Sequence, residues 1–94
     1  MKDGAQHYQD LLRVNQDAFT HELFLMSYHS LSAALACAIA LKDRAMLKEV
    51  ESMAHSQWQH LKTHFGNSIL LDEPLEVTLY SSLCQLANLR GLIF

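Results

Sequence analysis

Apolar residues recur at steps of three and four along most of this chain, a spacing that predicts amphipathic helices. Sustained alternation of apolar and polar residues, which is typical of strands, does not occur. We expect four helical segments, at about 5–19, 23–41, 44–65 and 74–92. The pattern predicts an all-α protein in which four antiparallel helices form two helical hairpins, as in a four-helix bundle.

The ends of these helices are marked unequally. Asp43 is a suitable N-cap for the third helix, and Gly66 is suited to a left-handed C-cap at its end. Residues 66–73 form the linker, and Pro74 favours a helix start because proline fits the first helical turn. Neither glycine nor proline marks a break at 20–22. The first two segments are therefore either separate helices or one bent helix.

The second segment, "LFLMSYHSLSAALACAIAL" at 23–41, holds no formally charged residue. It is long enough to span a bilayer, but three serines and a central histidine cancel most of its insertion free energy. A helix that is apolar nearly all round is otherwise a core helix. Its many small residues allow close approach of neighbouring helices. We therefore expect a central buried helix and no membrane span.

Length and composition narrow the class of protein. Ninety-four residues fit one helical domain, 1–94, and half of the residues are hydrophobic, so some apolar surface is expected to pack against a partner. The net charge of −3 and the scattered basic residues argue against nucleic acid as a partner. Cys37 and Cys84 lie far apart in apolar helices, which indicates reduced thiols. The polar N-terminus lacks a secretory signal, so a cytoplasmic location is expected.

Two resemblances concern the arrangement of the helices. The large and small residues of the first two segments are similar to those of a tetratricopeptide-type helical hairpin, although the turn glycine and closing proline are missing. The matching positions are Leu11, Val14, Asn15, Ala18, Phe19, Phe24, Ser27, Leu31 and Ala34.

Most of the chain also resembles small all-helical bacterial proteins to which no function is assigned. These carry "YHxLxAALxxA", then "LxDxxxLxxVxxxA", and a closing "YxSLxxxA", which reads here as Tyr80, Ser82, Leu83 and Ala87. Both resemblances imply antiparallel helical hairpins and no particular activity. One and a half repeats are too few for a solenoid, so the tetratricopeptide peptide groove is not carried over.

Catalytic signatures are missing from the sequence. There is no G-x-S-x-G elbow, glycine-rich phosphate loop or HExxH motif, and neither cysteine has a base beside it. We therefore do not expect an enzyme, and no cofactor is indicated. Among six histidines, His60 and His64 stand four residues apart on the third helix and are the best candidates for a metal site. Surface histidines beside an apolar stripe are the main alternative.

Tyr28 and His29 are candidates for a ligand pocket. His29 lies on an otherwise apolar helix, so it is expected either to be buried with a hydrogen-bond partner or to line a small pocket. A pocket beside these two side chains would indicate a ligand site, whereas a filled space would indicate a role in packing.

We therefore expect a small, non-catalytic protein–protein interaction module that self-associates as a homodimer, with an unknown protein partner also possible. The wide apolar arc of the last segment supplies the interface candidates, which are Val77, Tyr80, Leu83, Leu92 and Phe94. The alternative is a metal or small-ligand binder with a histidine-lined site between helices.

Overall fold

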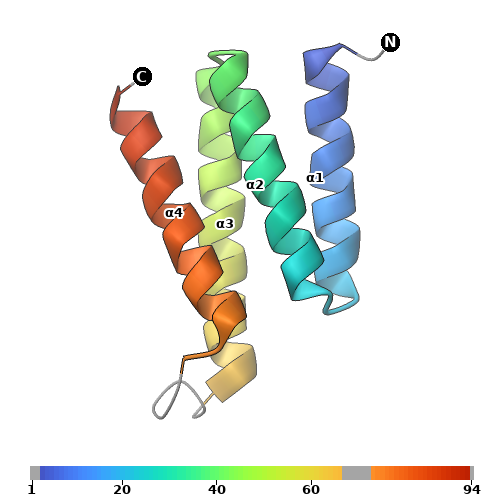
Figure 1. Cartoon of the computed structure of the whole chain (residues 1–94), viewed down its shortest axis with the longest axis vertical. Helices are drawn as coiled ribbons and strands as arrows, with labels where there is room; N and C mark the ends of the chain where they lie inside the picture. Colours follow the sequence, from blue (N-terminus) through green and yellow to red (C-terminus); the bar gives the residue numbers. More distant parts are fainter. Residues whose placement is uncertain (1–2, 67–72, 94) are drawn as a thin grey trace.

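Residues 3–66 and 73–93, which this computed structural model describes, form four α-helices that alternate in direction (Figure 1). At 92 and 93 the backbone alone is described. The helices are α1 (Gly4–Thr20), α2 (Phe24–Ala40), α3 (Arg44–Phe65) and α4 (Leu75–Ile93). The predicted all-α fold with four antiparallel helices is confirmed. α1 and α2 are separate helices, and most of the predicted linker lies outside the described residues.

The four helices form a flat assembly in which α2 is the shared neighbour. The Cα atoms extend 44 × 29 × 15 Å, and α2 contacts each of the other three helices. α1 and α4 lie at opposite edges, and the start of α1 and the end of α4 lie at the same end of the molecule (Figure 1). An edge helix has neighbours on one side only, so its other side faces solvent.

α2 is the central buried helix that the uncharged run predicts. Ala34 and Ala38 are fully buried and bring the neighbouring backbones close, while Leu31 and Leu35 fill the space between them. Among the described residues, no helix is both long enough and apolar enough to cross a membrane. The remaining buried residues of α2 are Phe24, Ser27 and Ser30.

Aspartate caps begin two of the helices. The Asp43 carboxylate accepts a hydrogen bond from the Met46 amide at 3.0 Å, which confirms the predicted N-cap of α3. Asp3 caps α1 in the same way, with the Gln6 amide at 2.7 Å. At the other end of α3, Gly66 has a φ of 56° and a ψ of −130°. Its φ is positive as predicted, but its ψ lies outside the left-handed helical region.

The turns after α1 and α2 share one geometry. Glu22 and Lys42 have positive φ angles of 61° and 52°, although neither is glycine. In each turn the amide of this residue donates to the carbonyl three residues earlier, and the next amide donates to the carbonyl five residues earlier. This pair of bonds is the Schellman motif, in which the residue with positive φ, called C′, is usually glycine. Backbone hydrogen bonds therefore end both helices where the sequence shows no glycine.

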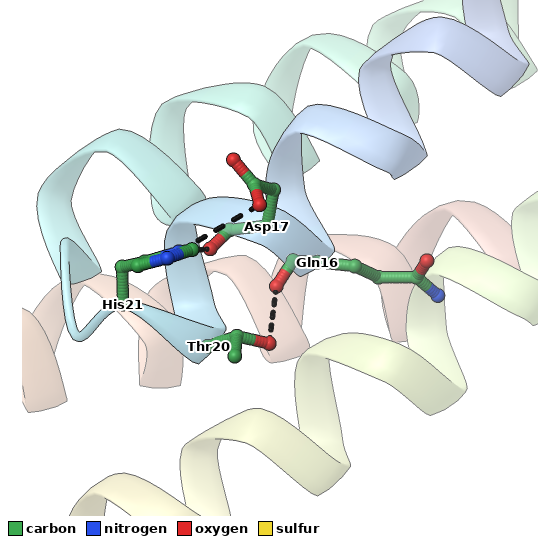
Figure 2. Close-up of polar contacts among 4 residues, drawn as sticks. All are labelled: Gln16, Asp17, Thr20 and His21. Atoms are coloured by element: carbon green, nitrogen blue, oxygen red, sulfur yellow. Dashed lines mark hydrogen bonds and ion pairs between the residues drawn. The ribbon is translucent and has the colours of Figure 1, made fainter.

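Side chains also satisfy carbonyl groups at the end of α1 (Figure 2). The Thr20 hydroxyl donates to the Gln16 carbonyl at 2.8 Å, and His21 Nδ1 lies 2.8 Å from the Asp17 carbonyl. Because a carbonyl only accepts, this contact requires a proton on Nδ1 of His21. The contact ties His21 to the last turn of α1.

Glycine at either left-handed turn position is expected to stabilise the protein. Non-glycine residues pay a steric cost there, so Glu22→Gly or Lys42→Gly should raise the free energy of unfolding by about 0.5–1 kcal/mol. Urea unfolding followed by circular dichroism measures this. As a control, Lys48→Gly in the exposed interior of α3 should lower it by about 1 kcal/mol. A loss of stability in both turn variants would contradict the strain argument.

Candidate functional site

A buried polar network joins all four helices and sets the position of α4. Asn15 on α1 and Gln57 on α3 exchange amide hydrogen bonds of 2.7 and 3.1 Å. The Asn15 amide also donates to the Ser27 carbonyl on α2 at 2.7 Å. On α4, the Tyr80 hydroxyl lies 2.7 Å from both Gln57 Oε1 and Ser27 Oγ. Asn15, Ser27 and Tyr80 are fully buried, which makes each of these bonds costly to lose.

The direction of these hydrogen bonds follows from one carbonyl. Because the Ser27 carbonyl only accepts, the Asn15 amide nitrogen must face it, and the Asn15 amide oxygen then faces Gln57 Nε2. Gln57 Oε1 then faces Tyr80, and because an amide oxygen only accepts, the Tyr80 hydroxyl donates to it. The single proton of the Ser27 hydroxyl is then shared between the Tyr80 oxygen and the Phe24 carbonyl, which lies 2.8 Å away. Because these hydrogen bonds need Tyr80 to point into the core, they set the orientation of α4 about its own axis.

The Tyr28–His29 pair does not form the predicted buried histidine. Tyr28 is half-buried, with its ring 6.0 Å from the Tyr80 ring, whereas His29 is exposed. The His29 ring rests edge-on against Tyr28, 5.4 Å between centroids. Of the two alternatives for His29, the buried, hydrogen-bonded side chain is wrong, because this position of α2 points outward. A ligand pocket at Tyr28 and His29 stays a prediction.

His60 and His64 lie together on α3 as their spacing predicts, and both are exposed. Their rings stack with centroids 6.4 Å apart and an interplanar angle of 22°. His60 contacts Phe19, and His64 contacts Phe24, each edge-on. Bonds of about 2.1 Å to one zinc ion hold two nitrogens within about 4 Å of each other, so these rings would have to turn.

Metal binding at this pair stays a prediction. Within residues 3–66 and 73–93, no group of three or more His, Cys, Asp or Glu side chains is arranged to hold a metal ion.

A groove of about 440 Å³ lies between α3 and α4. Glu51, His55 and Trp58 line it from α3, and Cys84 lines it from α4 together with Ser81, Gln85 and Asn88. Burial raises the pKa of the Cys84 thiol to about 11, and the Glu51 carboxylate adds to the rise. The thiol is therefore protonated at neutral pH and is a poor nucleophile. The groove therefore offers hydrogen-bonding groups beside a cysteine that is not activated as a nucleophile.

The outer face of α4 exposes several large apolar side chains. Leu75, Leu86 and Leu89 have 59%, 45% and 56% of their surface exposed, and Leu79 is half-buried. Together with the small Ser82, these positions recur at steps of three and four, so they form one stripe along the helix. We call this stripe, at 75, 79, 82, 86 and 89, the outer stripe.

The predicted interface residues lie on the opposite side of α4. Val77, Tyr80 and Leu83 are 1%, 0% and 3% exposed because they pack into the core against α2 and α3. Their position does not support the prediction that they contact a second chain. The side chain of Leu92 and all of Phe94 lie outside the described residues. The sequence does not reveal the outer stripe, because apolar residues lie on both the core side and the exposed side of this helix and form one wide arc.

Comparisons with known proteins returned no match to a protein-family model, to a curated protein or to a solved structure.

Loss of the Asn15 side chain is expected to destabilise all four helices together. Asn15→Ala removes three hydrogen bonds and leaves the Gln57 amide without its partner, so the free energy of unfolding should fall by about 2–4 kcal/mol. Chemical denaturation gives the value. The neighbouring Gln16→Ala, at an exposed position, should stay within about 0.5 kcal/mol of the wild type. Equal effects of the two substitutions would contradict the role of the network.

Alkaline pH is expected to unfold the protein. Burial raises the pKa of Tyr80 to about 12, and burial together with the Glu49 hydrogen bond raises the pKa of Tyr8 as well. Both pKa values lie above the unfolded value of about 10, so this stability is complete below pH 10 and is lost as pH rises toward 12. Urea unfolding at pH 8, 10 and 11 measures the decline. Tyr80→Phe removes one titrating group and should make it shallower; an unchanged slope would contradict the assignment.

Proposed function

We propose that this protein is a small, non-catalytic interaction module that self-associates through the outer stripe of α4. The observation that carries the proposal is an edge helix with apolar residues on two opposite sides. One side packs in the core, and the other exposes about half of Leu75, Leu86 and Leu89 to solvent. A helix that is apolar nearly all round is normally covered on more than one side.

Burial of the outer stripe against another apolar surface is energetically favourable. Burial of apolar surface contributes about 25 cal/mol for each Å² removed from water, and soluble monomers seldom leave a large contiguous apolar patch exposed. The stripe follows much of α4, whose 19 residues span about 28 Å. A second copy of the chain offers an equally apolar and equally long surface.

Other features fit a non-catalytic, cytoplasmic protein. The Cys84 thiol, with its pKa raised to about 11 by burial, is unsuited to nucleophilic catalysis at neutral pH. Cys37 and Cys84 are both free thiols, as expected in a reducing compartment. The net charge of −3 disfavours nucleic acid as a partner. The resemblance to tetratricopeptide-type hairpins and to small bacterial helical proteins stays a prediction.

A charge in the outer stripe is expected to prevent self-association. Leu86→Glu would bury a carboxylate in the interface, so the dimer should shift to monomer at tens of micromolar protein. Size-exclusion chromatography with light scattering measures the mass. Val14→Glu is the matched control, because Val14 is also 45% exposed but lies on α1. It should remain dimeric.

Two outcomes count against the proposal. A wild-type protein that is monomeric at this concentration would exclude self-association of useful strength. Equal loss of the dimer in Leu86→Glu and Val14→Glu would mean that the interface is not on the outer face of α4.

A further inference from the structure

The outer stripe reads nearly the same in both directions along α4. Two leucines, at 75 and 79, precede the small Ser82, and two more, at 86 and 89, follow it. The midpoint of 75 and 89 is position 82, and that of 79 and 86 falls between 82 and 83. A surface with this symmetry is complementary to a copy of itself turned by 180° about an axis through its middle.

The charges beside the stripe have the same symmetry with opposite sign. Glu76 lies in the first turn of α4 and Arg90 in its last turn, and their midpoint is position 83. At 100° per residue, both fall on the same flank of the stripe. A twofold rotation keeps each flank on its own side and exchanges the two ends. It would therefore place Arg90 of one copy beside Glu76 of the other, twice in each dimer.

A second carboxylate faces the same place. A shallow groove of about 290 Å³ lies where the starts of α2 and α4 meet, and Glu22 and Glu76 both line it together with Leu25 and Met26. Leu25 and Met26 are 43% and 53% exposed. The groove thus combines negative charge with apolar surface. A guanidinium on a long apolar stem has the complementary chemistry.

We propose that two copies of the chain pack their α4 helices antiparallel around a twofold axis near Ser82, each inserting Arg90 into the other's groove between Glu22 and Glu76. This proposal rests on the self-association proposed above and adds its geometry. Ser82 is the small residue at the crossing point, so the helices can approach to about 8 Å between axes. Leu75 and Leu79 of one copy then meet Leu89 and Leu86 of the other.

Charge-reversal variants of the full chain test this geometry. Glu76→Arg and Arg90→Glu should each replace two attractive pairs by two repulsive ones and raise the dimer dissociation constant about tenfold at low salt. The double variant Glu76→Arg/Arg90→Glu should dimerise more tightly than either single variant but less tightly than the wild type, because Glu22 still faces position 90. Rescue within one chain is excluded, since the two residues lie about 21 Å apart along the helix. Sedimentation equilibrium measures the constants.

Both charges also suit the dipole of α4, so circular dichroism must confirm that each variant is folded. Single variants that dimerise like the wild type, or a double variant as weak as the single ones, would overturn the antiparallel arrangement while leaving self-association intact. A monomeric wild type would instead remove the proposed function itself.

Cysteine cross-linking is an independent test of the same axis. Ser82→Cys should form a disulfide with its counterpart under mild oxidation, because facing Cα atoms in such a crossing lie about 4–6 Å apart. Leu75→Cys should not link to itself, but it should link to Leu89→Cys when the two proteins are mixed. Peptide mapping identifies the bonded residues. Self-linking at position 75 would indicate parallel helices and overturn the proposal.

Discussion

The hydrogen bonds among Asn15, Ser27, Gln57 and Tyr80 are the constraint on which the rest of the structure depends. Apolar packing alone tolerates sliding and rotation of a helix, whereas a buried hydrogen-bond network fixes both. Because Tyr80 is the member on α4, the network decides which side of α4 faces the core. The exposed outer stripe is therefore a consequence of a polar contact.

Much of the fold follows from local sequence rules. Periodic apolar residues predict the helices, and Asp43 and Gly66 mark the two ends of α3 because a carboxylate cap and a positive φ have strong residue preferences. The turns at Glu22 and Lys42 are different. Their left-handed conformation is held by backbone hydrogen bonds that any residue can make, so side-chain identity does not reveal them.

The candidate site was harder to predict than the helices. The last segment has apolar residues on two sides, and its sequence does not say whether Val77 and Leu83 or Leu75 and Leu86 face inward. That choice depends on Tyr80 meeting groups from three other helices. His29 illustrates the same difficulty, because exposure on a central helix depends on which of its sides the neighbouring helices cover. The spacing of apolar residues shows which residues share a side of a helix, and tertiary contacts decide which side is buried.

Trp58 gives the molecule a built-in optical reporter. It is the single tryptophan of the chain, and it lines the groove between α3 and α4. The Lys62 ammonium lies 3.8 Å from its ring centroid, and the His55 ring lies 5.7 Å away. Any movement of α4 away from α3 changes the solvent around this indole. Its fluorescence therefore responds to movement of α4 without a label, and a fluorescence change that precedes the loss of helical circular dichroism would separate loosening of α4 from unfolding of the whole bundle.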